Sequence, residues 1–439
     1  MVDDMGAAVT GRDKNTFVAT CDLGAVVRGR AVPADQLTDL MEVGVGWVPA
    51  DLALTCFDPI ADNIFGSVGD LRLLPDPTTL TEFAATADRP AMDVVLADQV
   101  TMAGEPWAAC PRSLCRRTLL AFEQLTGLHL VSAFEHEFML QPADTDQAFS
   151  LARLRGAEPL GSIIVNNLRT AGLPVQNWLP EYGSGQYEVT IAPAPGIAGA
   201  DRAILLREVV RDTTSALGRR ATFAPILDPG DVGNGVHLHF SLVNEDGRSV
   251  MHDPGAPGKL AEPARRFAAG VLAHAGALAA ISAASTVSYL RLTPHRWSAG
   301  GAFIGERNRE ALLRICPVIE FAGRTPQEQL HLEYRAADAT ANPWLVLGAV
   351  VQAGMQGFLH DLPDPHIWPE GATEEELAGV DPLPTDFSGA LEQLALDPVL
   401  STWLGEPLLA TYLSVKRAEI DSVSALSATD QCRRFADVY

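Results

Sequence analysis

Four short segments of the sequence place charged or hydrogen-bonding side chains two residues apart in strand-like surroundings. They are Glu135-His136-Glu137, Gln186-Tyr187-Glu188, His237-Leu238-His239 and Glu333-Tyr334-Arg335. Residues i and i+2 of a strand point to the same face, so each pair directs both side chains into one space. Burying so many charges is unfavourable unless partners compensate them. Carboxylates with one imidazole suit hard divalent cations, Mg²⁺ or Mn²⁺, better than zinc, and the pattern therefore indicates a metal-dependent enzyme.

Each pair has a simpler interpretation when it is taken alone. Glu135 and Glu137 could form the solvated face of an edge strand, and His237 and His239 could be structural histidines with satisfied hydrogen bonds. Apolar neighbours such as Phe134 disfavour the first alternative. The glycines of GNGVHLHFS disfavour the second, because glycine lets the backbone approach a ligand closely. Metal binding is indicated by the joint occurrence of all four pairs.

Two further features extend this site. In EYGSGQYE, a Gly-Ser-Gly bend can return Glu181 and Glu188 to one place, although the two glycines could equally serve a plain hairpin turn. Arginines form a second group, whose rigid donors match carboxylate and phosphate geometry. Its members are Arg291, Arg309, Arg314 and Arg335. Metals with several arginines indicate a polyanionic substrate, most simply a nucleoside triphosphate with a small acid, although any one arginine could form only a surface salt bridge.

The elements that must position these residues alternate irregularly between strands and helices. The first 105 or so residues read as short strands and turns, with strand candidates at 13–23 and 52–59. A helix from Pro111 to Gly127 precedes a strand at 128–140, and further helices are expected at 200–221, at 261–283 and, with breaks, at 382–423, whereas 361–384 reads as a long exposed loop. These elements predict an α+β fold around an antiparallel sheet, with domains at 1–108 and 109–439.

Composition narrows the possible partners and the cellular location. The 439 residues carry a net charge of −23 without a run of Lys or Arg, which disfavours nucleic acid and anionic membranes as partners. The six cysteines lack a C-x-x-C spacing and suit a reducing compartment. The start of the chain is polar, and the longest apolar stretch, 267–284, is too short and too polar to span a membrane. We therefore expect a cytoplasmic protein.

The order of these motifs resembles the glutamine synthetase family. The matching segments are FEHEF, EYGSGQYE, ATFAP, GNGVHLHFS, SYLRLTP, GERNREALLR and LEYRAADATANPW, which span about residues 134–344. The resemblance implies a small N-terminal β-grasp-like domain and a catalytic domain with a curved antiparallel sheet and flanking helices. It also implies a homo-oligomer, a dodecamer of two hexameric rings with sites between subunits.

The resemblance further implies ATP-dependent ligation, in which the γ-carboxylate of glutamate is phosphorylated and an amine then displaces phosphate. Two or more Mg²⁺ or Mn²⁺ ions would serve each site, one held by Glu137, Glu181 and Glu188, the other by Glu135, His237 and Glu333. Arg291 and Gly233 would hold the amino acid, and His239 and Ser241 would face the nucleotide. Arg309, Arg314 and Arg335 would stabilise charge on the transferring phosphoryl group, with Arg314 on the nucleotide side and Arg335 also contacting substrate.

The sequence departs from the ammonia-using members of this family. Trp297 stands six residues after Arg291, where those members have a glutamate that helps to deprotonate ammonium. The Asp-Gly-Ser-Ser loop that supplies an ammonium-binding aspartate is missing, Val232 replaces an asparagine, and His331 replaces an arginine. Because negative charge is lost where ammonium would bind, the sequence favours an organic amine, which could pack on Trp297. Such an enzyme would be similar to the ethanolamide, monoamine and anilide ligases of the family.

Three alternatives stay open at this point. The chain could be an ordinary glutamine synthetase that uses ammonia, or a non-catalytic relative with a structural or regulatory role. The complete set of six metal ligands argues against the non-catalytic role. Trp297 could also do no more than pack beneath its loop.

Overall fold

A ten-stranded sheet forms the centre of the larger part of the protein, seen here in a computed structural model that describes residues 14–86, 89–144, 146–294 and 296–439. Its strands run in the order β16-β13-β14-β15-β12-β7-β9-β8, and β10 and β11 pair with β7. Their bounds are β7 His129–Gln141, β8 Val175–Pro180, β9 Gln186–Ile191, β10 Ala194–Pro195, β11 Arg220–Thr222, β12 Val236–Val243, β13 Gly301–Glu306, β14 Ala311–Ile315, β15 Leu332–Tyr334 and β16 Ile367–Trp368.

Most neighbours in this sheet are antiparallel, but β13 runs parallel to both β14 and β16. The α+β class predicted from the sequence is confirmed. Along β7, residues 130 to 138 alternate between buried even positions and half-buried odd positions. This alternation is expected of a strand with one face on a core and one face on a polar site.

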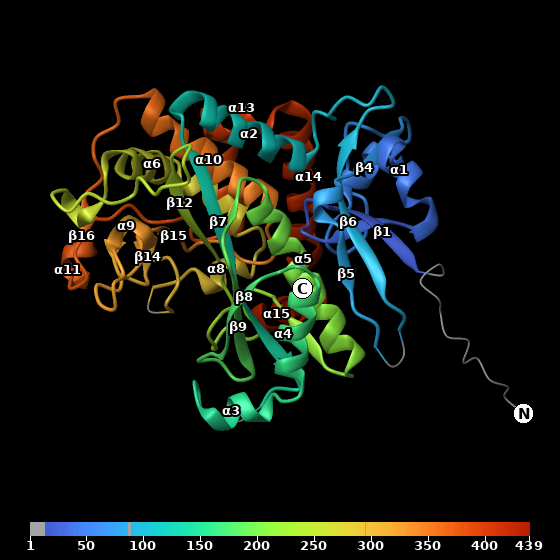
Figure 1. The fold of residues 1–439 in the computed structure, drawn as a ribbon. Helices are drawn as coiled ribbons and strands as arrows, with labels where there is room; N and C mark the ends of the chain where they lie inside the picture. Colours follow the sequence, from blue (N-terminus) through green and yellow to red (C-terminus); the bar gives the residue numbers. More distant parts are fainter. Residues whose placement is uncertain (1–13, 87–88, 145, 295) are drawn as a thin grey trace, which may run out of the picture.

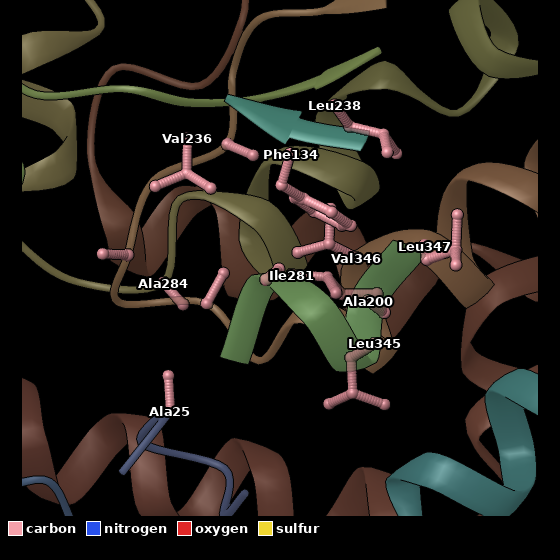
Figure 2. Close-up of a cluster of buried hydrophobic side chains, with 14 of the residues drawn as sticks. Ala25, Phe134, Ala200, Val236, Leu238, Ile281, Ala284, Leu345, Val346 and Leu347 are labelled. Carbon is pink, nitrogen blue, oxygen red and sulfur yellow. The ribbon is translucent and has the colours of Figure 1, made fainter. Parts of the chain in front are cut away.

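The even-numbered face of β7 and β12 packs against helices. Figure 2 shows Phe134 directed toward Val346, with Leu238 and Ile281 in the same buried cluster, and each of these side chains is no more than 2% exposed. The covering helices pack on one another, α10 (Pro343–Leu359) against α2 (Pro111–Thr126), α5 (Ala198–Ala216), α6 (Glu262–Ala273) and α7 (Ala275–Ser282). The helices therefore cover and fix one face of the sheet, and the polar residues lie on the opposite face.

A smaller mixed sheet lies on the N-terminal side of the molecule, drawn in blue in Figure 1. Its order is β2-β1-β6-β4-β3, with β5 on β6, and the central pair β1 and β6 is parallel. The bounds are β1 Asn15–Cys21, β2 Val27–Pro33, β3 Val45–Trp47, β4 Leu71–Pro75, β5 Thr81–Phe83 and β6 Met92–Val100, with helix α1 at Leu37–Val43. The first thirteen residues, part of the predicted N-terminal domain, lie outside the described residues.

A buried arginine joins the two parts of the chain. Arg112, at the start of α2, is completely buried and forms a bidentate pair with Asp201 on α5, at 2.9 and 2.8 Å. It also donates to Asp98 at 3.0 Å and to Asp76 at 2.8 Å, both on the N-terminal side. Such a fully satisfied buried arginine specifies the relative position of the elements around it. The predicted domain boundary near residue 108 lies just before this helix.

Three local predictions were wrong or incomplete. Residues 52–59 are not a strand, because a 3-10 turn at Pro49–Ala53 leads into a tight turn in which Leu54 bridges Ile60. The helix expected over 261–283 breaks into α6 and α7 at His274, whose ring contacts Asp397 at 2.7 Å. The loop expected over 361–384 contains β16 and the short helix α11 (Glu374–Leu377).

The helix expected over 200–221 is α5, which ends at Ala216, and Arg220–Thr222 forms β11 instead. The strand predicted after Gly127 is β7, and the broken helical segment near the end is α12 (Phe387–Leu396), α13 (Pro398–Leu404), α14 (Glu406–Val423) and α15 (Ala428–Ala436). Helices α3 (Leu151–Gly156) and α4 (Leu160–Thr170) lie between β7 and β8. Among the described residues, no helix combines the length and apolar character needed to cross a membrane.

Candidate active site

The site lies on the polar face of the sheet, where strand register sets its residues in rows. On β7 and β12, Glu135 pairs with His237, and on β7 and β9, Glu137 pairs with Glu188. Cross-strand partners on one face have Cβ atoms about 4.5–5.5 Å apart, which is close enough for side chains to share a ligand. The i, i+2 pairs of the sequence therefore meet across strands as well as along them.

Strands β15 and β14 add further charged residues to the same face of the sheet. Glu333 on β15 pairs with His239 on β12 and with Arg314 on β14. Arg335 follows Glu333 by two positions, and its guanidinium forms an ion pair with the Glu333 carboxylate. The four segments singled out in the sequence thus all reach one face of one sheet.

The first compact group comprises Glu135, His237 and Glu333. One ligand atom from each lies within 4.8 Å of the other two. His237 Nδ1 is 3.1 Å from Glu135 Oε1 and 3.5 Å from Glu333 Oε1. Two carboxylate oxygens and one imidazole nitrogen suit Mg²⁺ or Mn²⁺ and leave coordination positions open for substrate. The donor set predicted for one of the two metals is therefore gathered in one place.

The second compact group comprises Glu135, Glu137 and Glu188, again with ligand atoms within 4.8 Å of one another. The grouping differs from the sequence expectation, because Glu135 takes part in both groups and Glu181 in neither. The Glu181 carboxylate instead accepts a hydrogen bond from the backbone N–H of Tyr182 at 3.1 Å. The N–H of Gly235 donates to Glu137 Oε2 at 2.6 Å, which orients that side chain.

The electrostatics of these groups indicate that a cation completes them. Burial, followed by the neighbouring carboxylates, raises the pKa of Glu188 to about 10. Burial raises the pKa of Glu137 to about 7 against the opposing hydrogen bond from Gly235. In Glu333 the tendency of burial to raise the pKa is overcome by Arg335 and the two histidines, and its pKa falls to about 2. Three carboxylates with mutual repulsion fit a divalent ion, and the residues present match the metals that the sequence implied.

We expect Mg²⁺ binding to release protons from this group. Glu188 holds a proton at neutral pH because its pKa is raised to about 10, and a metal ion must displace that proton. Mg²⁺ affinity should therefore rise with pH between 6 and 8.5, by up to about tenfold per pH unit for each proton released. Calorimetric titration in two buffers of different ionisation enthalpy counts these protons. Glu188→Gln should release fewer, and a wild-type heat that is independent of buffer would contradict this expectation.

The four arginines occupy different positions. Arg314 Nη1 donates to Glu333 Oε2 at 2.9 Å, whereas Arg335 Nε and Nη2 donate to the carbonyl oxygens of Arg309 and Trp297, each at 2.8 Å. Arg309 itself is exposed.

Arg291 is 3% exposed and donates to the carbonyl oxygens of residues 336 and 337. Among the described residues, Arg291 Nε and Arg314 Nε are buried without a hydrogen-bond partner, so both retain donors for an anion.

A small pocket beside the second group contains the residues expected to bind the amino acid and the amine. Its lining includes Glu137, Glu181, Gly233, Arg291 and Trp297. A Cβ at position 233 would lie 2.5 Å from Arg291 Cγ, so only glycine fits against this arginine. The replacement at Val232 also lines the pocket.

Trp297 does not pack beneath its loop, which was one of the alternatives. Its side chain is 55% exposed, and its ring lies edge-on to that of Tyr182, with centroids 5.4 Å apart. Tyr182 is 54% exposed and lines the same pocket. Sequence reasoning missed Tyr182, although its place beside Glu181 in EYGSGQYE was a usable signal. The backbone of Trp297 has φ +53°, an uncommon conformation for a bulky residue that is often found at functional sites.

A larger cavity of about 370 Å³ has Glu135 in its lining. His239 and Ser241, the residues predicted to face the nucleotide, both line it, together with Asn177, Thr190 and His331. The cavity thus adjoins both a carboxylate shared by the two groups and polar side chains suited to a ribose or a base.

Comparison with known proteins assigns a class to this arrangement. Residues 108–434 match the protein family described as "Glutamine synthetase, catalytic domain". Residues 12–107 match the family described as "Glutamine synthetase N-terminal domain". Gamma-glutamylpolyamine synthetase GlnA3 of Streptomyces coelicolor is 32% identical, over 96% of this chain and 93% of its own length. Type-1 glutamine synthetase 1 of Dictyostelium discoideum is 26% identical, over 96% and 89%.

Solved structures give the same result. A protein described as a novel glutamine synthase homolog superposes with a TM-score of 0.90 at 42% identity, covering 97% of this chain and 98% of its own. The ligand-free structure of GmaS superposes with a TM-score of 0.81 at 25% identity and covers 98% of each chain. Fold and site together define an ATP-dependent ligase that forms carbon–nitrogen bonds. The chain belongs to the glutamine synthetase family.

Proposed function

We propose that this enzyme activates the γ-carboxylate of glutamate with ATP and joins it to an organic amine rather than to ammonia. The observation that carries the choice of acceptor is the exposed pair of Tyr182 and Trp297 beside the carboxylates of Glu137 and Glu181. An aromatic face attracts an alkylammonium group by about 0.5–2 kcal/mol and offers apolar contact to its carbon chain. Ammonium gains nothing from that second contact.

Two divalent ions, Mg²⁺ or Mn²⁺, would be held by the groups that share Glu135. Bound there, they would neutralise phosphate charge during transfer from ATP. The protein's own donors serve the rest of the reaction. Arg291, buried with an unsatisfied Nε, would hold the α-carboxylate of glutamate beside Gly233. Arg335, Arg314 and the exposed Arg309 would stabilise the transferring phosphoryl group, and the cavity at His239 and Ser241 would take the nucleotide.

The pocket also suggests how a protonated amine could lose its proton without the glutamate that Trp297 replaces. Glu181 lies outside both compact groups, and burial raises its pKa above that of an exposed glutamate. Its carboxylate lines the pocket next to the aromatic pair and is thus the group best placed to receive that proton. The likeness to a polyamine-using relative, GlnA3, makes polyamines the first acceptors to test.

Phosphate release separates this proposal from its alternatives. Purified enzyme with ATP, Mg²⁺ and glutamate should release phosphate fastest with an organic amine among ammonium, ethanolamine, short alkylamines, polyamines and aniline. We expect kcat/KM for the best amine to exceed that for ammonium by about tenfold or more, on the order of the aromatic contact energy. Ammonium as the best acceptor would indicate an ordinary glutamine synthetase. A protein that binds no ATP with Mg²⁺ would be a non-catalytic relative. A ring-shaped dodecamer remains our expectation for its assembly.

A further inference from the structure

A further cluster of metal-binding side chains lies next to the carboxylates and has a different chemistry. It comprises His239, Cys316 and His331, whose ligand atoms lie within 4.8 Å of one another. We propose that these residues bind one borderline or soft divalent ion, of which Zn²⁺ is the type, beside the Mg²⁺ groups. This inference goes beyond the ligase reaction and does not rest on it.

Strand register explains why these side chains meet. Cys316 directly follows β14, and His331 directly precedes β15, and the backbone N–H of Cys316 donates to the His331 carbonyl at 3.2 Å. His331 and Glu333 are two positions apart on one face, as are His237 and His239 on β12. The cluster therefore continues the rows of the active site on the same polar face, at the side of the 370 Å³ cavity, which both histidines line.

The distances match a tetrahedral site. His239 Nδ1 is 3.1 Å from His331 Nε2 and 3.8 Å from Cys316 Sγ. Ligands bound to zinc at about 2.0–2.1 Å for nitrogen and about 2.3 Å for sulfur lie about 3.3–3.6 Å apart in a tetrahedron. The observed separations bracket this range, so side-chain adjustments of a few tenths of an ångström would complete the geometry. Three protein ligands leave a fourth position for water or for a ligand oxygen from the cavity.

The surroundings of the remote ring nitrogens support the same conclusion. His331 Nδ1 lies 2.7 Å from the carbonyl oxygen of Gln329, so that nitrogen carries the proton and Nε2 presents a lone pair to the cluster. His239 Nε2 forms no hydrogen bond among the described residues, but it lies 3.3 Å from Glu135 Oε2, and this charge contact favours the proton on Nε2 and a free Nδ1. A carbonyl or a carboxylate behind each histidine is the usual support of a metal-binding imidazole.

The donor types distinguish this cluster from the two carboxylate groups. One thiolate and two imidazoles favour zinc, cobalt or copper over Mg²⁺, which prefers oxygen. Cys316 is 4% exposed, so the thiol is protected from bulk solvent, and metal binding would displace its proton to water. Physiological Mg²⁺ would therefore not occupy this position, whereas a trace metal could.

Cobalt titration tests the proposal without any turnover. Chelator-treated protein in saturating Mg²⁺, which occupies the carboxylate groups, is titrated with Co²⁺, and the near-ultraviolet thiolate-to-cobalt charge-transfer band is recorded. We expect a band that saturates at one equivalent and that excess Zn²⁺ abolishes. Cys316→Ala should remove it, and His331→Gln should weaken Co²⁺ binding by at least about tenfold. Cys432→Ala, at a buried cysteine on α15, is the matched control and should leave the band unchanged.

Two results would overturn the proposal. One is the absence of a charge-transfer band in the wild-type protein, and the other is an unchanged band in Cys316→Ala. If Cys316→Ala fails to fold, His331→Gln replaces it in the test, because His331 is only half-buried and its substitution should be tolerated. Unchanged Co²⁺ affinity in His331→Gln would then overturn the proposal. Because neither ATP nor an amine is present, failure of this test leaves the ligase proposal intact, and failure of the ligase proposal does not affect this one.

Discussion

Glu135→Ala should reduce the rate of phosphate release at least about a thousandfold and weaken metal binding at both carboxylate groups. Glu135 contributes a ligand atom to each of the two groups, the first with His237 and Glu333 and the second with Glu137 and Glu188. Loss of metal stabilisation worth several kcal/mol corresponds to three or more orders of magnitude in rate. Glu188→Ala, which touches only the second group, should abolish turnover but leave one ion bound.

Manganese binding followed by electron paramagnetic resonance distinguishes these two variants, and phosphate release measures their activity. Glu392→Ala, at an exposed glutamate on α12, is the matched control and should retain wild-type turnover and metal stoichiometry. Circular dichroism and the melting temperature verify that each variant is folded. Persistent turnover in a folded Glu135→Ala or Glu188→Ala protein would refute the assignment of these residues to the metals.

Trp297→Glu should shift acceptor preference from the organic amine toward ammonium. The substitution removes a cation–π contact of about 0.5–2 kcal/mol and introduces a carboxylate that attracts a small cation. We expect the ratio of kcat/KM for the amine to that for ammonium to fall on the order of 10- to 100-fold. Because the tryptophan is 55% exposed, the change should leave the fold unaltered.

Trp297→Gln provides the matched control, since it removes the ring without adding charge. It should lower kcat/KM for the amine and leave that for ammonium near the wild-type value. Tyr182→Ala should also lower kcat/KM for the amine, because the rings of Tyr182 and Trp297 pack together at the pocket. If Trp297→Glu and Trp297→Gln leave both acceptors unchanged, the ring has no part in acceptor choice.

Sequence patterns predicted the parts of this site that depend on local periodicity. The strand β7 was evident because charged residues alternate with Phe134 and Phe138, and the helix α2 because its apolar spacing ends at Gly127. The four i, i+2 pairs followed from strand geometry alone, since side-chain direction in a strand is set by position. Their meeting on one face required the register of β7, β9, β12 and β15, which a linear pattern does not contain.

Apart from Tyr182, which had a local signal, the main features that sequence reasoning missed depend on contacts between distant segments. The break between α6 and α7 coincides with the contact of His274 to Asp397, 123 residues away. Strand β16 exists because it pairs with β13, not because of its own two residues. The sharing of Glu135 and the place of Cys316 beside His239 likewise follow from cross-strand packing. Each is a tertiary effect that overrides or adds to local preference.

Direct identification of the product tests the central claim of ATP-dependent γ-glutamylation of an organic amine. The enzyme is incubated with ATP, Mg²⁺ and glutamate in the presence of equal concentrations of ammonium and a mixture of polyamines and short alkylamines. Mass spectrometry then quantifies glutamine and each γ-glutamylamide formed. We expect a γ-glutamylamide of an organic amine as the main product, in amounts that match the ADP released. Glutamine as the main product, or ADP release with no amide, would contradict the account.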